Sequence, residues 1–341
     1  MFSLEKIVRP NILALKPYSS ARDEFKGTAT AYLDANENPF GTLNRYPDPL
    51  QKQLKEKLSE IKNVPAENIF IGNGSDEAID LCFRIFCEPG KDKVLTFTPT
   101  YGMYKVSADI NNVDLTEVQL TADFQIDVKN ALPLLKDENL KLVFLCSPNN
   151  PTGNILTDVE VILQNFSGIV VVDEAYIDFS DTVSLSQKLV QYPNLIVLQT
   201  LSKAWGLAAA RVGLAFASAE IISLFNKVKP PYNVSRLNYE AALLALENQE
   251  IVAQQKAILL AERAALIDDL GQLPLTKKIY PTDANFVLVE VTDADTIYNA
   301  LVERGIILRN RNTVISGCLR ITIGTPEENT LLITTLKSLQ L

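Results

Sequence analysis

The sequence feature that most limits the possible folds is a series of short apolar runs between residues 93 and 217. Runs of this length with few polar interruptions are typical of strands buried on both faces of a parallel sheet. Helical patterns, such as those at 75–87 and 157–166, alternate with the runs, which predicts an α/β sheet with helices on both faces. The predicted strands are KVLTF (93–97), KLVFLC (141–146), GIVVVDE (168–174), NLIVLQ (194–199) and RVGLAFA (211–217).

A second pattern begins after Pro231. Residues 235–270 are rich in Ala and Leu, contain no proline and have helical periodicity, which predicts a long helix with at most one break. Strand-like apolar runs follow at 285–291 and 319–324, so we expect a second, smaller α/β domain. The predicted organisation is an N-terminal arm (1–30) that joins the small domain, a large domain (31–245) and a small C-terminal domain (246–341).

The absence of histidine limits the chemistry more than any other feature of the composition. With no His among 341 residues, an imidazole base and a His-ligated metal site are both excluded. Acid–base steps must therefore use Lys, Tyr, Asp, Glu or Cys, and we expect no metal. The net charge of -9 argues against a nucleic-acid partner, because phosphate backbones are bound by clustered Lys and Arg.

The four cysteines bear on the cellular compartment. Cys82, Cys87, Cys146 and Cys318 form no C-x-x-C pair, and unpaired thiols are typical of a reducing cytosol. The first ten residues contain no signal-like apolar stretch, and no apolar run reaches the length of a membrane span. We therefore expect a cytoplasmic protein with no membrane partner.

Two motifs rich in Gly or Pro lie where a ligand could bind. In GNGSDEAIDL (72–81), two glycines precede Ser75 and Asp76 at the start of a predicted helix. Unpaired N–H groups and the helix dipole would hold a phosphate there, although an ordinary capped helix has the same pattern. SPNNPTG (147–153) follows a buried strand. It is either part of a ligand site at the carboxyl edge of the sheet or a Pro-rich turn.

Asp173 and Tyr176 stand at the end of the third predicted strand. A carboxylate that emerges from an apolar strand needs a cation or hydrogen bonds. A protonated pyridine nitrogen would supply such a cation, and the Tyr176 phenol could bond a phenolate-type oxygen. The alternative is a carboxylate that only caps a loop.

Lys203 and Arg211 belong to the motif TLSKAWGLAAAR (200–211), which follows the strand at 194–199. Small residues around both cations allow a ligand to approach the backbone closely. A lysine shielded from water has a lowered pKa and becomes a usable nucleophile, and an arginine can bind phosphate through two hydrogen bonds. A solvated surface lysine is the ordinary alternative.

The order and spacing of these motifs resemble the aminotransferase family of pyridoxal-phosphate enzymes, with the aspartate-aminotransferase-like fold. The resemblance is closest to the histidinol-phosphate branch of that family and covers nearly the whole chain. It implies a mainly parallel sheet with helices on both faces plus a smaller α/β domain. The blocks that carry it include LKPYSSAR, LDANENP, NRYPDP, GNGSDEAIDL, CSPNNPTG, VDEAYIDF, TLSKAWGLAAAR, GIILR and SGCLRITIG.

For the cofactor, the resemblance implies a role for each matching residue. Lys203 would form the covalent link to pyridoxal phosphate, and Asp173 would pair with its pyridine nitrogen. Tyr176 and Asn150 would bond the ring oxygen O3′, which makes Lys203, Asp173 and Tyr176 the implied catalytic residues. Tyr101 would stack on the ring. The phosphate would be held by the amides of Ser75 and Asp76 and by Thr200, Ser202 and Arg211.

The resemblance also implies substrate residues. Arg320, Arg309 and Tyr18 would bind the substrate phosphate, and Asn36 and Glu37 would lie near its imidazole end. The implied reaction is reversible amino transfer between L-histidinol phosphate and 2-oxoglutarate, giving imidazole-acetol phosphate and L-glutamate, in histidine biosynthesis. An aromatic aminotransferase and a threonine-phosphate decarboxylase of the same fold are the alternatives.

Tyr46, in NRYPDP, bears on the assembly. It matches a tyrosine that reaches the cofactor phosphate of the partner subunit, so the resemblance implies a homodimer. A turn aromatic that packs only within its own chain is the alternative.

Overall fold

The larger of two sheets contains all five of the predicted strands. The computed structural model describes residues 2–19, 21–25, 27 and 29–339, and residues 1, 20, 26, 28, 340 and 341 of the predicted arm and small domain lie outside them. The seven strands of the larger sheet have the order β1-β7-β6-β5-β4-β2-β3. They are β1 (Ile69–Asn73), β2 (Lys93–Thr98), β3 (Asp114–Gln119), β4 (Leu140–Cys146), β5 (Ile169–Asp173), β6 (Leu195–Thr200) and β7 (Val212–Phe216).

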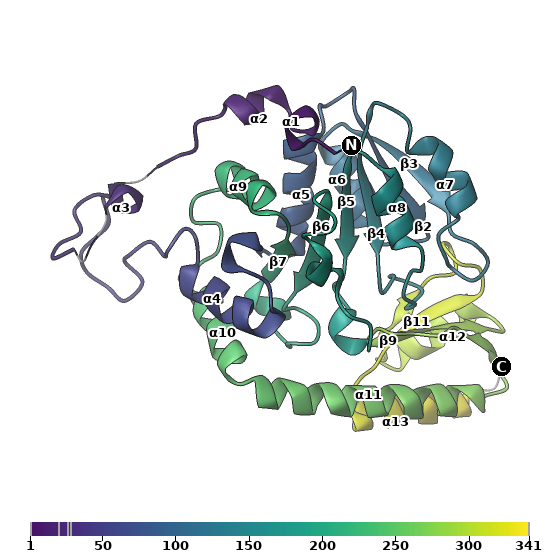
Figure 1. Ribbon diagram of the computed structural model, residues 1–341. Helices are drawn as coiled ribbons and strands as arrows, with labels where there is room; N and C mark the ends of the chain where they lie inside the picture. Colours follow the sequence, from purple (N-terminus) through teal and green to yellow (C-terminus); the bar gives the residue numbers. More distant parts are fainter. Residues whose placement is uncertain (1, 20, 26, 28, 340–341) are drawn as a thin grey trace.

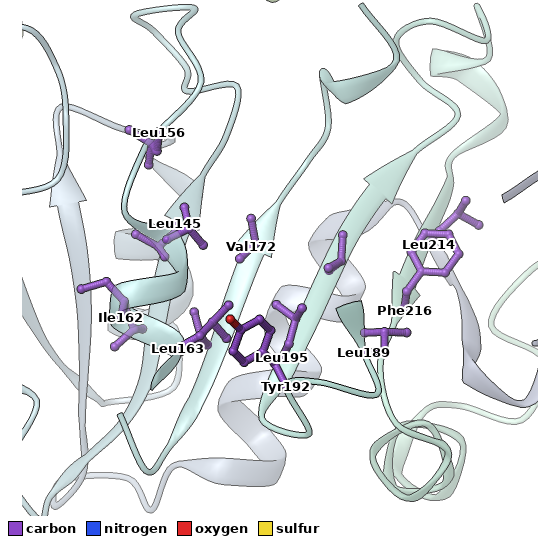
Figure 2. Close-up of a cluster of buried hydrophobic side chains, with 14 of the residues drawn as sticks. Leu145, Leu156, Ile162, Leu163, Val172, Leu189, Tyr192, Leu195, Leu214 and Phe216 are labelled. Atoms are coloured by element: carbon purple, nitrogen blue, oxygen red, sulfur yellow. The ribbon is translucent and has the colours of Figure 1, made fainter. Parts of the chain in front are cut away.

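Two apolar layers cover this sheet because its central strands are apolar on both faces. In β4, Val143 and Leu145 belong to one layer and Leu142 and Phe144 to the other, as strand alternation requires. Figure 2 shows part of the first layer, with labelled side chains from α8 and from strands β4, β5, β6 and β7. Helices α4 (Lys52–Lys62), α7 (Val128–Leu134), α8 (Val159–Asn165) and α10 (Arg236–Glu247) cover this face, and α5 (Ser75–Phe86), α6 (Met103–Ile110) and α9 (Ala219–Val228) cover the opposite one.

The prediction that RVGLAFA forms a parallel strand is wrong. β7 pairs antiparallel with both β6 and β1. A parallel return would need a crossover of a dozen or more residues, usually an α-helix. The connection from β6 instead holds the Lys203 turn and the short 3-10 helix η4 (Ala208–Ala210). The remaining 3-10 helices are η1 (Ala66–Asn68), η2 (Ile177–Phe179) and η3 (Leu185–Lys188).

The C-terminal part forms a second, antiparallel sheet with its own core, below the first sheet in Figure 1. The predicted long helix is broken once, at Asn248, between α10 and α11 (Gln249–Gly271). We keep the domain boundary near residue 245 as a proposal. The strand order is β10 (Arg309–Asn310), β11 (Cys318–Thr322), β9 (Phe286–Val291), β8 (Thr276–Ile279), and the helices are α12 (Ala294–Glu303) and α13 (Pro326–Ser338).

The start of the predicted arm packs on the large sheet and not on the smaller one. Val8, which follows α1 (Leu4–Ile7), and Ile12 of α2 (Pro10–Ala14) belong to the core beneath α5. Apolar burial of this kind fixes a chain end, so the expected attachment to the small domain is wrong for these residues. α3 (Ala21–Glu24) and the segment after it project away from the body of the chain (Figure 1). In the described part of the chain, no helix combines the length and apolarity that a membrane crossing needs.

Candidate active site

A cavity of about 560 Å³ lies between the carboxyl ends of β4, β5 and β6 and the β10–β11 hairpin. Ligands of open α/β sheets bind at this edge. The cavity brings together every predicted cofactor residue except Tyr46, and two of the predicted substrate residues. The predicted residues that line it are Ser75, Asp76, Tyr101, Asn150, Asp173, Tyr176, Thr200, Ser202, Lys203, Arg211, Arg309 and Arg320.

Asp173 forms the floor of the cavity at the end of β5. Its side chain is buried, and its oxygens accept hydrogen bonds from the Tyr104 hydroxyl at 2.8 Å and the Ala175 amide at 3.1 Å. Burial nevertheless raises the pKa of Asp173 to about 6. Among the described residues Asp173 forms no ion pair. A cationic ring nitrogen would supply that charge partner, so Asp173 suits a pyridoxal ring.

Lys203 lies in the turn after β6, with Nζ 5.5 Å from the centroid of the Tyr176 ring. Partial burial lowers the pKa of Lys203, and the positive charge of Arg320 lowers it further, whereas Asp173 and Asp76 oppose the shift. The residue still has accessible surface because the cavity is open. A lowered pKa raises the fraction of neutral amine, which is the form that attacks carbonyl groups or accepts protons.

Tyr176 is connected to the smaller sheet through Asn150. The Asn150 amide donates to the Tyr176 hydroxyl at 3.3 Å, and Arg320 of β11 donates to the Asn150 side-chain oxygen. The Arg320 guanidinium also stacks 5.1 Å from the centre of the Phe286 ring. Burial raises the pKa of Tyr176, so the phenol keeps its proton and can donate a hydrogen bond.

The other end of the cavity suits a phosphate. α5 begins at Ser75 after Gly74, which provides no capping side chain, so its first amides point into the cavity as donors. A Cβ on Gly74 would lie 2.6 Å from Nη2 of Arg211, and one on Gly213 would lie 2.1 Å from the Ser75 amide nitrogen. The two glycines therefore let the helix N-terminus and the guanidinium form one anion cradle.

The Asp76 carboxylate contacts both Tyr101 and Arg211. It accepts a hydrogen bond from the Tyr101 hydroxyl at 3.2 Å and lies 3.7 Å from Arg211. Arg211 itself has a left-handed backbone, with φ 51°, a conformation that is costly for a residue with a Cβ and that recurs at ligand sites. Thr200 and Ser202 are joined next to it, since the Ser202 amide donates to the Thr200 hydroxyl at 3.0 Å.

The remaining predicted residues lie away from this cavity within one chain. Asn36, Glu37 and Tyr46 line a separate depression of about 550 Å³, where the Tyr46 ring stacks on Tyr232 at 4.4 Å. Tyr18 is 71 % exposed. The structure therefore does not bring these four side chains together with Lys203.

Two residues of the cavity region were missed by the sequence reasoning. Tyr104, which bonds Asp173, is fully buried on α6 and reads as a core aromatic in the sequence. Arg311 lines the cavity beside Arg309 and Arg320. Its signal was the R-N-R triplet at 309–311, in which alternate residues of an extended segment share a face.

Comparison with known proteins identifies the family. The profile of aminotransferase class I and II matches residues 17–336. The chain belongs to this family. Histidinol-phosphate aminotransferase of Cytophaga hutchinsonii is 54 % identical over 346 residues, covering 99 % of both chains. The enzyme of the same name from Parabacteroides distasonis is also 54 % identical over 346 residues, covering 100 % of both chains. The expected enzyme class, a transaminase, is thereby confirmed.

Solved structures agree on the fold and cofactor of the family. Histidinol-phosphate aminotransferase from Sinorhizobium meliloti, in complex with pyridoxal-5'-phosphate, has a TM-score of 0.76 and 26 % identity, covering 89 % of this chain and 90 % of its own. A Thermus thermophilus aspartate aminotransferase mutant (TM-score 0.73, 22 % identity, 89 % and 93 % covered) confirms the expected fold class. L-Threonine-O-3-phosphate decarboxylase from Porphyromonas gingivalis shares that fold, with a TM-score of 0.73 and 21 % identity over 87 % and 90 % of the two chains.

Proposed function

We propose that this enzyme is a histidinol-phosphate aminotransferase. It exchanges an amino group between L-histidinol phosphate and 2-oxoglutarate, with pyridoxal phosphate as cofactor, in histidine biosynthesis. The observation that carries the proposal is a cavity with two cationic ends, one at Arg211 and α5 and the other at Arg309 and Arg320. One end suits the cofactor phosphate, and the other suits a second anionic group on the substrate. Full-length relatives with this name support the choice of substrate.

Each cofactor residue has a proposed task. Lys203 would hold the cofactor covalently, and after the substrate amine has displaced it, the freed Nζ would take up the proton that leaves the substrate carbon. Asp173 keeps the ring nitrogen protonated, and Tyr176 and Asn150 bond the ring oxygen. The bound cofactor supplies an electron sink for the substrate carbon. Tyr101 covers the ring face, and the amides of Ser75 and Asp76 with Thr200, Ser202 and Arg211 hold the phosphate.

We also propose a cytoplasmic homodimer. Tyr46 is 51 % exposed although its ring stacks on Tyr232, so part of its surface is available to a partner's cofactor phosphate. Assembly would also bring Tyr18, Asn36 and Glu37 toward the partner's cavity, with the Glu37 carboxylate held in place by Arg45 at 2.6 Å and by the Tyr46 amide at 2.7 Å. Exposed aromatic side chains on a projecting segment are common in interfaces.

A half-reaction experiment tests the substrate. L-Histidinol phosphate, L-threonine phosphate and L-phenylalanine are added separately to the purified holoenzyme, and the bound cofactor's absorbance is followed as it converts to the amine form. We expect conversion with histidinol phosphate and none in a Lys203→Ala variant. If only threonine phosphate or phenylalanine reacts, the proposed substrate is wrong and one of the alternatives of the same fold takes its place.

A further inference from the structure

Arg311 has no task in the function proposed so far, yet it faces the cavity. It follows the two-residue strand β10, and its amide donates to the Cys318 carbonyl of β11 at 3.0 Å, which continues the hairpin. Asn310 turns away and donates to Asp295 at 2.7 Å. Strand alternation therefore places Arg309 and Arg311 on the same face, and both line the cavity.

The three arginines of the hairpin form an unbalanced positive cluster. Arg309 and Arg320 are paired in register across β10 and β11, and like charges in opposite positions destabilise a sheet. Burial and the charges of these two neighbours lower the pKa of Arg311 to about 10. Among the described residues, none of the three forms an ion pair with a carboxylate.

Hydrogen bonding in the cluster is also incomplete. The Nε atoms of Arg311 and Arg320 are buried without an acceptor in the described chain. A buried donor without a partner is destabilising, and more so when it carries a charge. An anion bound between these arginines would offset their mutual repulsion and would accept hydrogen bonds from the unpaired Nε–H groups. The hairpin therefore has the properties expected of an anion-binding site.

We propose that Arg311 is a third substrate-binding arginine, which with Arg309 and Arg320 recognises a phosphate group and favours it over a carboxylate. The identity of the phosphorylated substrate rests on the proposed function. A phosphate monoester carries a charge of about -1.5 to -2 and three acceptor oxygens at neutral pH. A carboxylate carries one charge and two oxygens, so a third guanidinium adds more to phosphate binding.

The test compares Arg311→Gln with Arg311→Lys and with a matched control, Arg304→Gln. Arg304 lies at the end of α12, where its guanidinium donates to the Ala300 carbonyl at 2.8 Å, and it does not line the cavity. KM is measured separately for L-histidinol phosphate and L-glutamate. Binding of inorganic phosphate to each holoenzyme is measured by calorimetry.

For Arg311→Gln we expect KM for histidinol phosphate to rise at least tenfold, KM for glutamate to change less than threefold, and the Kd of inorganic phosphate to rise. Arg311→Lys should recover part of the loss, and Arg304→Gln should resemble the wild type. Unchanged constants, or equal losses for both substrates, would overturn the proposal. If the wild type does not convert histidinol phosphate, the proposed function fails. The phosphate titrations then decide the role of Arg311 without that substrate.

Discussion

The role of Tyr104 could not be predicted from the sequence. Its hydroxyl is the nearest donor to a buried carboxylate that we assign to the cofactor ring. In Tyr104→Phe, we expect cofactor affinity to fall about tenfold, because hydrogen bonds to charged groups contribute about 1.5–3 kcal/mol. Equilibrium titration of the apoenzyme with pyridoxal phosphate measures the change.

Tyr192→Phe is the control for this prediction. Tyr192 also donates to a carboxylate, Glu160, at 2.6 Å, but far from the cavity. Equal cofactor affinity in Tyr104→Phe and in the control would contradict a positioning role for the Tyr104 hydroxyl.

Two buried carboxyl groups make stability depend on pH. Burial raises the pKa of Glu174 to about 7 and that of Asp173 to about 6, above their unfolded values of 4.5 and 3.8. The native state therefore binds more protons, and the free energy of unfolding of the apoenzyme should fall as pH rises from 5 to 7. No imidazole contributes in this window, because the chain has no histidine.

The variant Glu174→Gln isolates the larger part of this effect. Because glutamine does not titrate, the free energy of unfolding of the variant should change with pH by less than that of the wild type, the difference being on the order of 3 kcal/mol. Urea unfolding of wild type and variant at pH 5, 6, 7 and 8 measures it. An unaltered pH dependence in the variant would show that Glu174 does not titrate in this range.

At the residue scale, the sequence located the residues that follow strand ends. Asp173 is the last residue of the apolar strand β5 and Lys203 lies in the turn just after β6, so their place at the carboxyl edge of the sheet could be predicted from the pattern. Arg311 could not, because its orientation depends on a strand of only two residues. Partners within the core, such as Tyr104, depend on packing that no linear pattern contains.

At the scale of elements, apolar runs in the sequence predicted strands correctly, whereas strands at the edges of the large sheet were missed. β3 lies at the sheet edge and alternates polar residues, so its pattern resembles a loop. β1 was missed although it is mostly buried, because its last two residues, Gly72 and Asn73, belong to the glycine-rich motif. Strand direction was wrong for β7, since burial predicts a strand but only the length and helicity of the connection predict its direction.

The contact of β7 with α5 yields a prediction at this scale. In Gly213→Ala, the new Cβ would lie 2.1 Å from the Ser75 nitrogen and 2.2 Å from the Gly74 carbonyl carbon. Backbone atoms cannot rotate away, so we expect a loss of about 2–3 kcal/mol in stability and weaker binding of the cofactor phosphate. Urea unfolding and cofactor titration measure the two effects.

Gly271→Ala is the matched control, because among the described residues outside its own helix its Cβ would meet nothing nearer than the Ile279 side chain at 3.9 Å. It should keep or slightly raise stability, since alanine is the better helix former. A Gly213→Ala protein as stable as this control would mean that β7 and α5 can separate at little cost.

At the scale of the whole molecule, the proposed dimer makes each site a product of two chains. A homodimer that carries Tyr46→Ala in both chains, or Lys203→Ala in both chains, should have reduced transaminase activity. A mixed dimer of the two variants contains one site with Lys203 of one chain and Tyr46 of the other. We therefore expect it to regain about half of the wild-type activity, measured on dimers purified through two different tags.

The control is a mixed dimer in which one chain carries both substitutions and the other is wild type. One site then lacks only Tyr46, and the other lacks only Lys203, so activity should be no higher than in the Tyr46→Ala homodimer. If the control mixture is the more active of the two, Tyr46 acts within its own chain, and if the two mixtures are equally active, Tyr46 has no role in the site.

The separation of the two cationic ends has a consequence for how such enzymes diversify. The cofactor end is built from the large sheet, whereas Arg309, Arg311 and Arg320 belong to a hairpin of the smaller one. Gene duplication followed by change at Arg309 and Arg311 could give a new substrate range while the inherited chemistry stays intact. Arg320 is different, because its bond to Asn150 connects it to the cofactor residues. Redesign of an aminotransferase should therefore vary the first strand of the hairpin and keep Arg320.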